Sequence, residues 1–489
     1  MPIPKDILAV ARPKNTFVVV YGKNKNLYAV RERLGCKYKE GRRVPVNGRT
    51  IGHIVDFKYV PIEKKIENIS KSTKKVEKVD LKDWANIQLC DNLFSSVISE
   101  LKQHYSDSDA LKLYCIAILR VCYPDIKDCE LKEFYDNSFL SELYPGVALS
   151  KNTVSKFIND IGKTCSRIIS FMRARADKID KDHHILIDGT LKTSNSKINT
   201  LSDFSRKSKI KGDRSISVLY AYDLEAKEPV CCKCYPGNMI DAVAYNNFVQ
   251  ENHITKGLLV CDKGFPSSCA KEAFNANPDL HYLNPIKRNS KFIETHDLFN
   301  YTGVLKGVEN IHYRKEKCHG TNKWLYSFKD INAACQEEQD WTRRIQKGKT
   351  SMEKLNQVKP CFGTIIFECD LDLEPEVIYS AYSKRWEIEL VMRYYKFACG
   401  FDDTRVHDDY SVIGSEFCNF LSSLLTFKLL NKFDDTKVLN KETYKHVMRV
   451  LRRAKKIRLN QEDSEWSLIN INVSHEKLLN TLGLIELAD

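Results

Sequence analysis

Residues 183–189 have the sequence HHILIDG, and residues 257–262 have the sequence GLLVCD. Each is a short apolar run typical of a buried strand, and the two runs contain Asp188 and Asp262 at or near their ends. Strand and helix patterns alternate around them, which predicts an α/β fold with a mixed sheet. The other expected strands are 215–223, 228–234, 281–285 and 363–368, and the expected helices are 241–251, 267–276 and 374–397.

The two aspartates are expected to share one site. Acids at the carboxyl ends of buried strands lie at the rim of an open sheet, where ligands and metals bind. The alternative is that each aspartate only caps a turn, since Gly189 follows Asp188 directly and Gly264 lies two residues after Asp262. A third acid in the same region favours a metal site.

That third acid is Glu389, within the sequence YSKRWEIELVMRYYK at 382–396. On a helix with about 100° per residue, Tyr382, Arg385, Glu389 and Lys396 fall within an arc of ~60°. This stripe presents a carboxylate beside two cations and a phenol, which suits a metal ion and the phosphates bound next to it. A solvated, salt-bridged helix face is the alternative.

The stripe resembles a known motif. It matches Y-(2)-R-(3)-E-(6)-K at all four positions, a pattern shared by bacterial DDE transposases of the insertion-sequence type, the IS-four group. Other features of that family follow in order over roughly residues 180–430. They are Asp188-Gly189-Thr190, Pro236-Gly237-Asn238 with Asp241, Asp262, a β-rich insertion, and Thr404-Arg405-Val406-His407 leading to Gly414 and Phe417.

The resemblance implies an RNase H-like catalytic domain in which Asp188, Asp262 and Glu389 are the catalytic residues and bind two Mg²⁺ or Mn²⁺ ions. It also implies cut-and-paste transposition, with cleavage at terminal inverted repeats, a hairpin intermediate and joining to target DNA. Tyr382, Arg385 and Lys396 resemble the DNA-phosphate contacts of this group. Trp386 is similar to a tryptophan that supports a flipped base, although an indole on such a helix also suits a core position.

A basic stretch follows the first aspartate, at 192–214. Its position next to Asp188 indicates that these charges contact DNA near the metal site, whereas a solvent-facing charge run is the alternative. The DNA-binding residues predicted here are Lys192, Arg206, Lys207, Lys209, Lys211 and Arg214.

The expected organisation is a catalytic core interrupted by an insertion, with an N-terminal β and helical region and C-terminal helices. Its predicted parts are a small β region (1–62), a basic linker (63–83), a helical, DNA-binding region (84–178), the first part of the catalytic core (179–288), the β-rich insertion (289–360), the second part with the Glu-bearing helix (361–432), and a C-terminal helical region (433–489).

Composition fits a DNA partner. The 77 basic and 64 acidic residues leave a formal charge of +13, and 43% hydrophobic residues exclude a disordered chain. No apolar run is long enough to span a membrane, and the 17 cysteines suit reduced thiols, so a cytoplasmic protein is expected. The resemblance to the bacterial transposases implies a nucleoid-associated prokaryotic enzyme that acts on DNA as a homodimer. The rival functions are an RNase H-like nuclease and a domesticated DNA-binding protein without catalysis.

Overall fold

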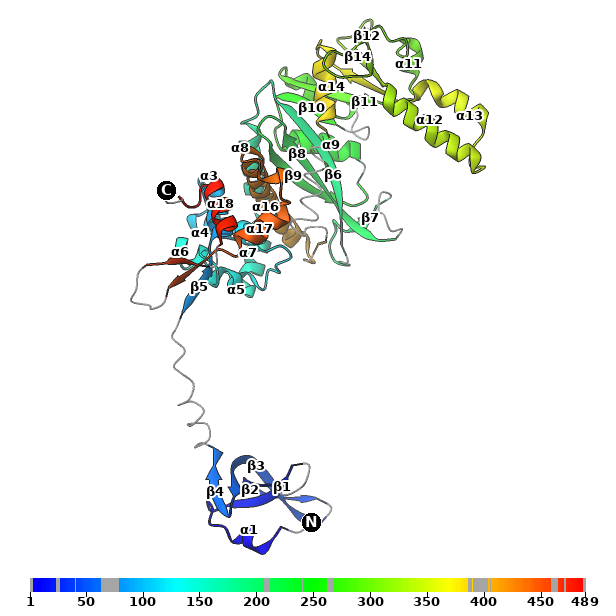
Figure 1. The fold of residues 1–489 in the computed structure, drawn as a ribbon. Helices are drawn as coiled ribbons and strands as arrows, with labels where there is room; N and C mark the ends of the chain where they lie inside the picture. Colours follow the sequence, from blue (N-terminus) through cyan, green and yellow to red (C-terminus); the bar gives the residue numbers. More distant parts are fainter. Residues whose placement is uncertain are drawn as a thin grey trace. The chain divides into compact units, whose positions relative to one another are not determined.

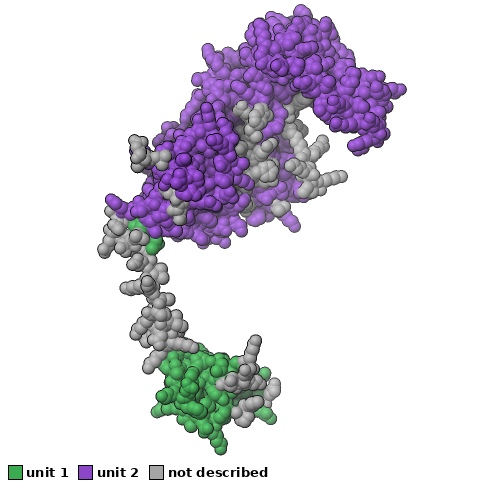
Figure 2. Space-filling view, in the orientation of Figure 1, with its two compact units in different colours: residues 1–80, 458–464 green, residues 81–457, 465–489 purple. Residues whose placement is uncertain are grey.

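The computed structural model describes residues 3–22, 27–39, 41–62, 79–194, 196–205, 212–239, 241–261, 267–385, 389, 403–404, 406–458, 465–469 and 472–486. The chain divides into two compact units, residues 1–80 with 458–464 and residues 81–457 with 465–489 (Figure 2). Each unit is described by itself below.

The first unit is an antiparallel sheet in the order β1-β2-β3-β4, accompanied by a short helix α1. A small core of Ile7, Val18, Val30 and Ile54 lies against it. The elements are α1 (Lys5–Ala9), β1 (Thr16–Tyr21), β2 (Leu27–Lys39), β3 (Arg42–Val55) and β4 (Lys58–Pro61).

Helices open the second unit, as the periodicity between residues 84 and 175 predicts. They are α3 (Ala85–Lys102), α4 (Asp107–Cys122), α5 (Leu131–Asp136), α6 (Leu140–Leu143), α7 (Lys151–Lys163) and α8 (Cys165–Ala176). The long apolar helix α16 (Asp409–Asp435) packs against α3, α4, α7 and strand β9. Helices α7 and α16 approach so closely at Gly162 and Gly414 that a Cβ on either glycine would lie about 2 Å from a backbone oxygen of the other helix.

One large mixed sheet forms the centre of this unit, which confirms the predicted α/β class (Figure 1). Five strands are adjacent in the order β9-β8-β6-β10-β11. The pairings β9–β8 and β8–β6 are antiparallel, while β6–β10 and β10–β11 are parallel. These strands are β6 (His184–Thr193), β8 (Arg214–Asp223), β9 (Glu228–Pro236), β10 (Gly257–Cys261) and β11 (Leu280–Ile286), and the short β7 (Asp203–Phe204) pairs with β8.

The predicted insertion extends the same sheet. Strand β11 pairs with β15 (Thr364–Cys369), and β14 (Trp324–Asp330), β13 (Ile311–Lys317) and β12 (Gly303–Val304) continue the order outward, all antiparallel. Helices α12 (Ile331–Gln346) and α13 (Met352–Val358) lie side by side in this region (Figure 1). The remaining helical segments around the sheet are α9 (Asp241–Glu251), η1 (Ser267–Ala270), α10 (Lys271–Ala276), α11 (Lys291–Thr295) and η2 (Lys359–Cys361).

The single helix predicted over 374–397 is corrected by the structure. Helix α14 (Pro375–Ser383) ends in a turn at Lys384 and Arg385. The Ser383 hydroxyl donates to the carbonyl oxygen of Ser380 at 2.8 Å, and such local bonds compete with the helical pattern. Residue 389 is again helical, while 386–388 and 390–402 lie outside the described residues.

The chain closes with η4 (Val438–Asn440), α17 (Tyr444–Leu451), strands β16 (Lys455–Arg458) and β17 (Ser467–Ile469), and α18 (Val473–Thr481). Strands β17, β16 and β5 (Asp80–Asp83) form a small sheet. Among the helices of the described ranges, none combines the length and the hydropathy that crossing a bilayer requires.

Candidate active site

Strand β6 continues beyond Asp188 to Thr193, so this aspartate lies in the middle of its strand and not at the carboxyl end that the sequence predicted. Residues 185–187 are buried, and Asp188 is the first half-buried position after them. Its Oδ1 accepts a hydrogen bond from the backbone N–H of Gly189 at 2.8 Å. In the antiparallel register Asp188 is opposite Tyr220, so both side chains lie on the same face of the sheet.

Strand β10 brings the position before the second predicted aspartate next to β6. Cys261 is the parallel register partner of Ile187, and both are buried. Asp188 and Asp262 are the residues that follow these partners in the sequence. Asp262 itself lies outside the described residues.

Helix α14 anchors the predicted stripe on the sheet through Tyr382. The Tyr382 ring packs on Phe367 of β15, with ring centroids 4.4 Å apart. The Arg385 guanidinium lies 5.6 Å from the centre of the Tyr382 ring, and its Nη2 donates to Glu389 Oε1 at 3.0 Å. Three members of the stripe therefore form a connected group. The Glu389 side chain is 55% exposed, so a ligand from solvent can reach its carboxylate.

Other predicted site residues fall outside the described residues. Besides Asp262, these are Trp386, Lys396, Arg206, Lys207, Lys209 and Lys211. The two ends of the basic stretch are described. Arg214 begins β8, where its guanidinium lies 5.1 Å from the centre of the Phe204 ring and donates to the carbonyl oxygen of Ser202 at 3.4 Å. Phe204 and Arg214 thus flank the segment that carries the central cations of the stretch.

Lys192 is at odds with its predicted contact to DNA. Its side chain is 1% exposed, and its ammonium group pairs with Glu416 of α16, which is also buried. A lysine held in the interior by a carboxylate has no access to a phosphate, so we do not retain Lys192 as a DNA-binding residue. Glu416 was not predicted as a site residue, and its signal in the sequence is a lone acid within the apolar run of α16.

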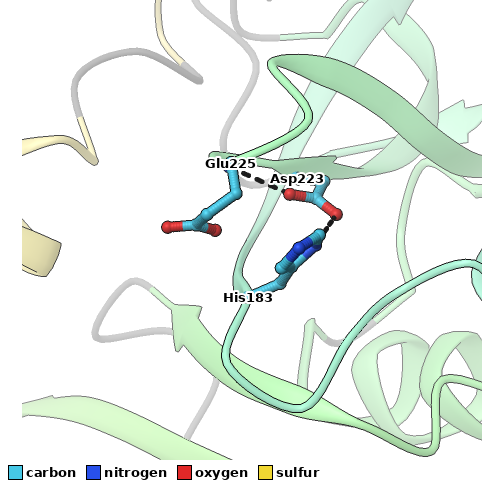
Figure 3. A group of neighbouring side chains, drawn as sticks. All are labelled: His183, Asp223 and Glu225. Carbon is cyan, nitrogen blue, oxygen red and sulfur yellow. Dashed lines mark hydrogen bonds and ion pairs between the residues drawn. The ribbon is translucent and has the colours of Figure 1, made fainter.

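A second polar group, formed by His183, Asp223 and Glu225, lies at the start of β6 (Figure 3). His183 Nδ1 and Asp223 Oδ2 are 2.6 Å apart, and Asp223 Oδ1 accepts from the backbone N–H groups of Glu225 and Ala226 at 3.0 and 2.9 Å. Burial lowers the pKa of His183, but the hydrogen bond and charge of Asp223 outweigh it and raise the pKa above its usual value. Because Asp223 is buried and bonded to the turn that follows β8, this group fastens the start of β6 to that turn.

The part of the chain that contains Asp188 and Glu389 matches a known protein family. Residues 180–412 match the family model described as "Transposase DDE domain". The chain carries a transposase DDE domain. This family cuts DNA and transfers its strands, so the protein is an enzyme of DNA transposition.

The match spans both parts of the large sheet and includes Asp188, the Tyr382–Glu389 group and the insertion between them. No curated protein matches the chain. Among solved structures, it is similar to the cryo-EM structure of the piggyBac transposase synaptic complex with hairpin DNA, with a TM-score of 0.41 and 12% identity, over 77% of this chain and 82% of that chain.

Proposed function

We propose that the protein is a cut-and-paste transposase of the IS-four group. In this proposal it cuts at the terminal inverted repeats of its own element and joins the ends to target DNA. The observation that carries the proposal is the transposase DDE domain at 180–412, together with the Tyr-Arg-Glu part of the motif gathered around Glu389.

The topology supports an RNase H-like core in residues 179–288 and 361–432. A central strand, β6, is antiparallel to β8 on one side and parallel to β10 on the other. Asp188 lies on this strand, and Asp262 follows the parallel neighbour by one peptide bond.

Asp188, Asp262 and Glu389 are the residues that would hold the divalent cations. The described donors fit hard cations, because Asp188 is a half-buried carboxylate at the sheet and Glu389 is an exposed one. When bound, two Mg²⁺ or Mn²⁺ ions would activate the attacking oxygen and stabilise the leaving oxygen. Glu389 would exchange its bond with Arg385 for this role, and the guanidinium would then bind a phosphate.

DNA would be held on both sides of these acids. Arg385, with Tyr382 beneath it, is placed to clamp a phosphate next to Glu389. Lys396 and Trp386 would add a second phosphate contact and a surface for an unpaired base. Arg214 and the cations between residues 206 and 211 would contact the duplex close to Asp188. Two protomers, one for each end, would form the active dimer on DNA.

The test uses the full chain, Mg²⁺ and a duplex that carries the inverted repeats flanking the gene. Asp188→Asn, Asp262→Asn and Glu389→Gln should each abolish strand cleavage and leave end binding within about twofold of wild type. Glu294→Gln changes an exposed acid of α11 in the same way and should cleave normally. Cleavage at the wild-type rate removes the substituted residue from the site.

The rivals give different results in the same assay. A nuclease would hydrolyse DNA without joining the ends to a target plasmid. A domesticated binding protein would hold the ends without cutting them, even as the wild-type chain. Cleavage followed by joining is the outcome that we expect.

A further inference from the structure

Positive charge is concentrated at the start of the chain. Residues 1–62 contain 13 Lys and Arg but only 4 Asp and Glu, so this short segment carries +9 of the total formal charge of +13. The site described above lies entirely in the second unit and uses none of these residues. A strongly basic module with no assigned role therefore remains to be explained.

Part of this charge lies on a two-stranded ribbon. Near Val30 and Ile54, strands β2 and β3 pack on the small core of the first unit. Further along, residues 35–39 of β2 pair with residues 42–46 of β3, and we call these two segments the basic hairpin. Every residue of 35–39 and 42–44 is exposed, so the ribbon presents both of its faces to solvent.

Register distributes the cations over the two faces. Lys37 is opposite Val44 and Lys39 is opposite Arg42, whereas Tyr38 is opposite Arg43. Directly opposed residues share a face and alternate residues switch faces. One face therefore carries Lys37, Lys39 and Arg42, and the other carries Arg43 beside the Tyr38 ring, which is 76% exposed.

Folding does not account for these charges. Within the described residues, the four cations of the basic hairpin form no ion pair, while Arg49 at its base pairs with Glu32 at 3.5 Å. An isolated two-stranded ribbon is only marginally stable in water. Charged residues also discourage edge-to-edge aggregation, which is the alternative explanation for lysines on such a ribbon.

We propose that the basic hairpin is a second DNA-binding element, which lies in a groove of duplex DNA. The major groove is about 12 Å wide and admits a two-stranded ribbon, whose strands are about 4.8 Å apart. Cations on both faces can then reach the phosphates of both groove walls. Duplex DNA is favoured over a flat anionic surface, because a flat surface would engage only one face of the ribbon.

The test measures binding of the full chain in EDTA to a duplex of arbitrary sequence, across a series of salt concentrations. Each lost phosphate contact reduces the log–log salt slope by about 0.9, so the quadruple variant Lys37→Ala/Lys39→Ala/Arg42→Ala/Arg43→Ala should reduce it by about 3–4. The quadruple variant Lys37→Arg/Lys39→Arg/Arg42→Lys/Arg43→Lys keeps the charges and should keep the slope. That second variant separates loss of contact from loss of fold.

A matched control removes four exposed cations from the C-terminal region of the second unit. These are Lys441, Lys445, Arg453 and Lys477. Their substitution by Ala changes the net charge equally and should leave the slope within about 0.5 of wild type, well below the loss expected for four contacts.

Equal slopes for the two alanine quadruples would overturn the proposal and leave protection against aggregation as the role of the hairpin. Selective loss of binding to single-stranded DNA, RNA or anionic vesicles, with duplex binding unchanged, would also overturn it. The readout requires no cleavage. Its failure would therefore leave the proposed catalytic function standing, and loss of catalysis in the Asp188→Asn variant would not affect this test.

Discussion

Lys192 and Glu416 form an ion pair in the interior of the second unit, with side chains only 1% and 4% exposed. Lys192 is on β6, four residues after Asp188, and Glu416 is on α16. Side chains alternate along a strand, so Lys192 and Asp188 point to the same face of the sheet. Asn419 also donates to Glu416 Oε1, at 3.0 Å. The pair thus fixes β6, the strand that bears the first candidate catalytic acid, to α16.

Lys192→Met should destabilise the protein strongly. It leaves the Glu416 carboxylate buried without its cation, which costs about 3–5 kcal/mol. The double variant Lys192→Met/Glu416→Leu removes both charges and should recover most of this loss. Urea unfolding checks both variants. A single variant with unchanged stability and weakened DNA binding would instead restore the phosphate contact predicted from the sequence.

The crossing of α7 and α16 depends on two glycines. A Cβ at Gly162 would lie 1.8 Å from the carbonyl oxygen of Tyr410, and one at Gly414 would lie 2.0 Å from that of Ile158. Backbone atoms on both sides leave no room for adjustment. Gly162→Ala and Gly414→Ala should each cost about 1–3 kcal/mol or more in thermal unfolding.

Ser155→Ala, at an exposed position of α7, is the matched control for Gly162→Ala. It should leave the thermal midpoint nearly unchanged, because a surface substitution usually changes stability by less than about 0.5 kcal/mol. Equal midpoints for the glycine variants and this control would show that the two helices can separate at no cost.

Sequence periodicity predicted most elements of the large sheet to within a few residues. Helix α9 has the predicted bounds, β8 begins one residue earlier than predicted, and β10 begins at the predicted Gly257. The pairing of the strands could not be predicted from periodicity, because a strand pattern shows which residues are apolar but not which other strand lies beside that strand. No strand pattern therefore indicated that β11 pairs with β15, the pairing that joins the insertion to the sheet.

The candidate site shows the same limit. The spacing of Tyr382, Arg385 and Glu389 predicted a group that the structure does bring together. Lys192 was misassigned because its partner is 224 residues away along the chain. A lysine beside a catalytic acid and a lysine that pairs inside a core look alike in one sequence, and only the packing of α16 distinguishes them.

Arg385 should contribute more to the affinity for DNA than its neighbour Lys384. If Arg385 clamps a phosphate, Arg385→Ala should make the log–log salt slope of end binding shallower by about 0.9. Lys384 is exposed on the adjacent position, and Lys384→Ala provides the control with the same change in charge. Both variants should unfold near the wild-type midpoint. Identical slopes would show that the Arg385–Glu389 pair is only a solvated ion pair.

The His183–Asp223 pair should make stability depend on pH. The folded state raises the pKa of His183 above its ordinary value of 6.5. A raised folded pKa means that the stabilisation is fully present below the unfolded pKa and is lost as the pH rises through the folded pKa. His183→Gln should therefore lower the free energy of unfolding by about 1.5–3 kcal/mol at pH 5.5, the usual contribution of a hydrogen bond to a charged group, and by less at pH 8.5.

Urea unfolding of the wild type and of His183→Gln at the two pH values checks this expectation. His253 is the control, because its contact with Asp177 is longer, at 3.5 Å, and both side chains are more than 60% exposed. His253→Asn should produce little difference at either pH, since an exposed ion pair contributes little. A difference between wild type and His183→Gln that grows as the pH rises would reverse the sign of the linkage. It would mean that the neutral imidazole, rather than the imidazolium, holds Asp223 and the start of β6 in place.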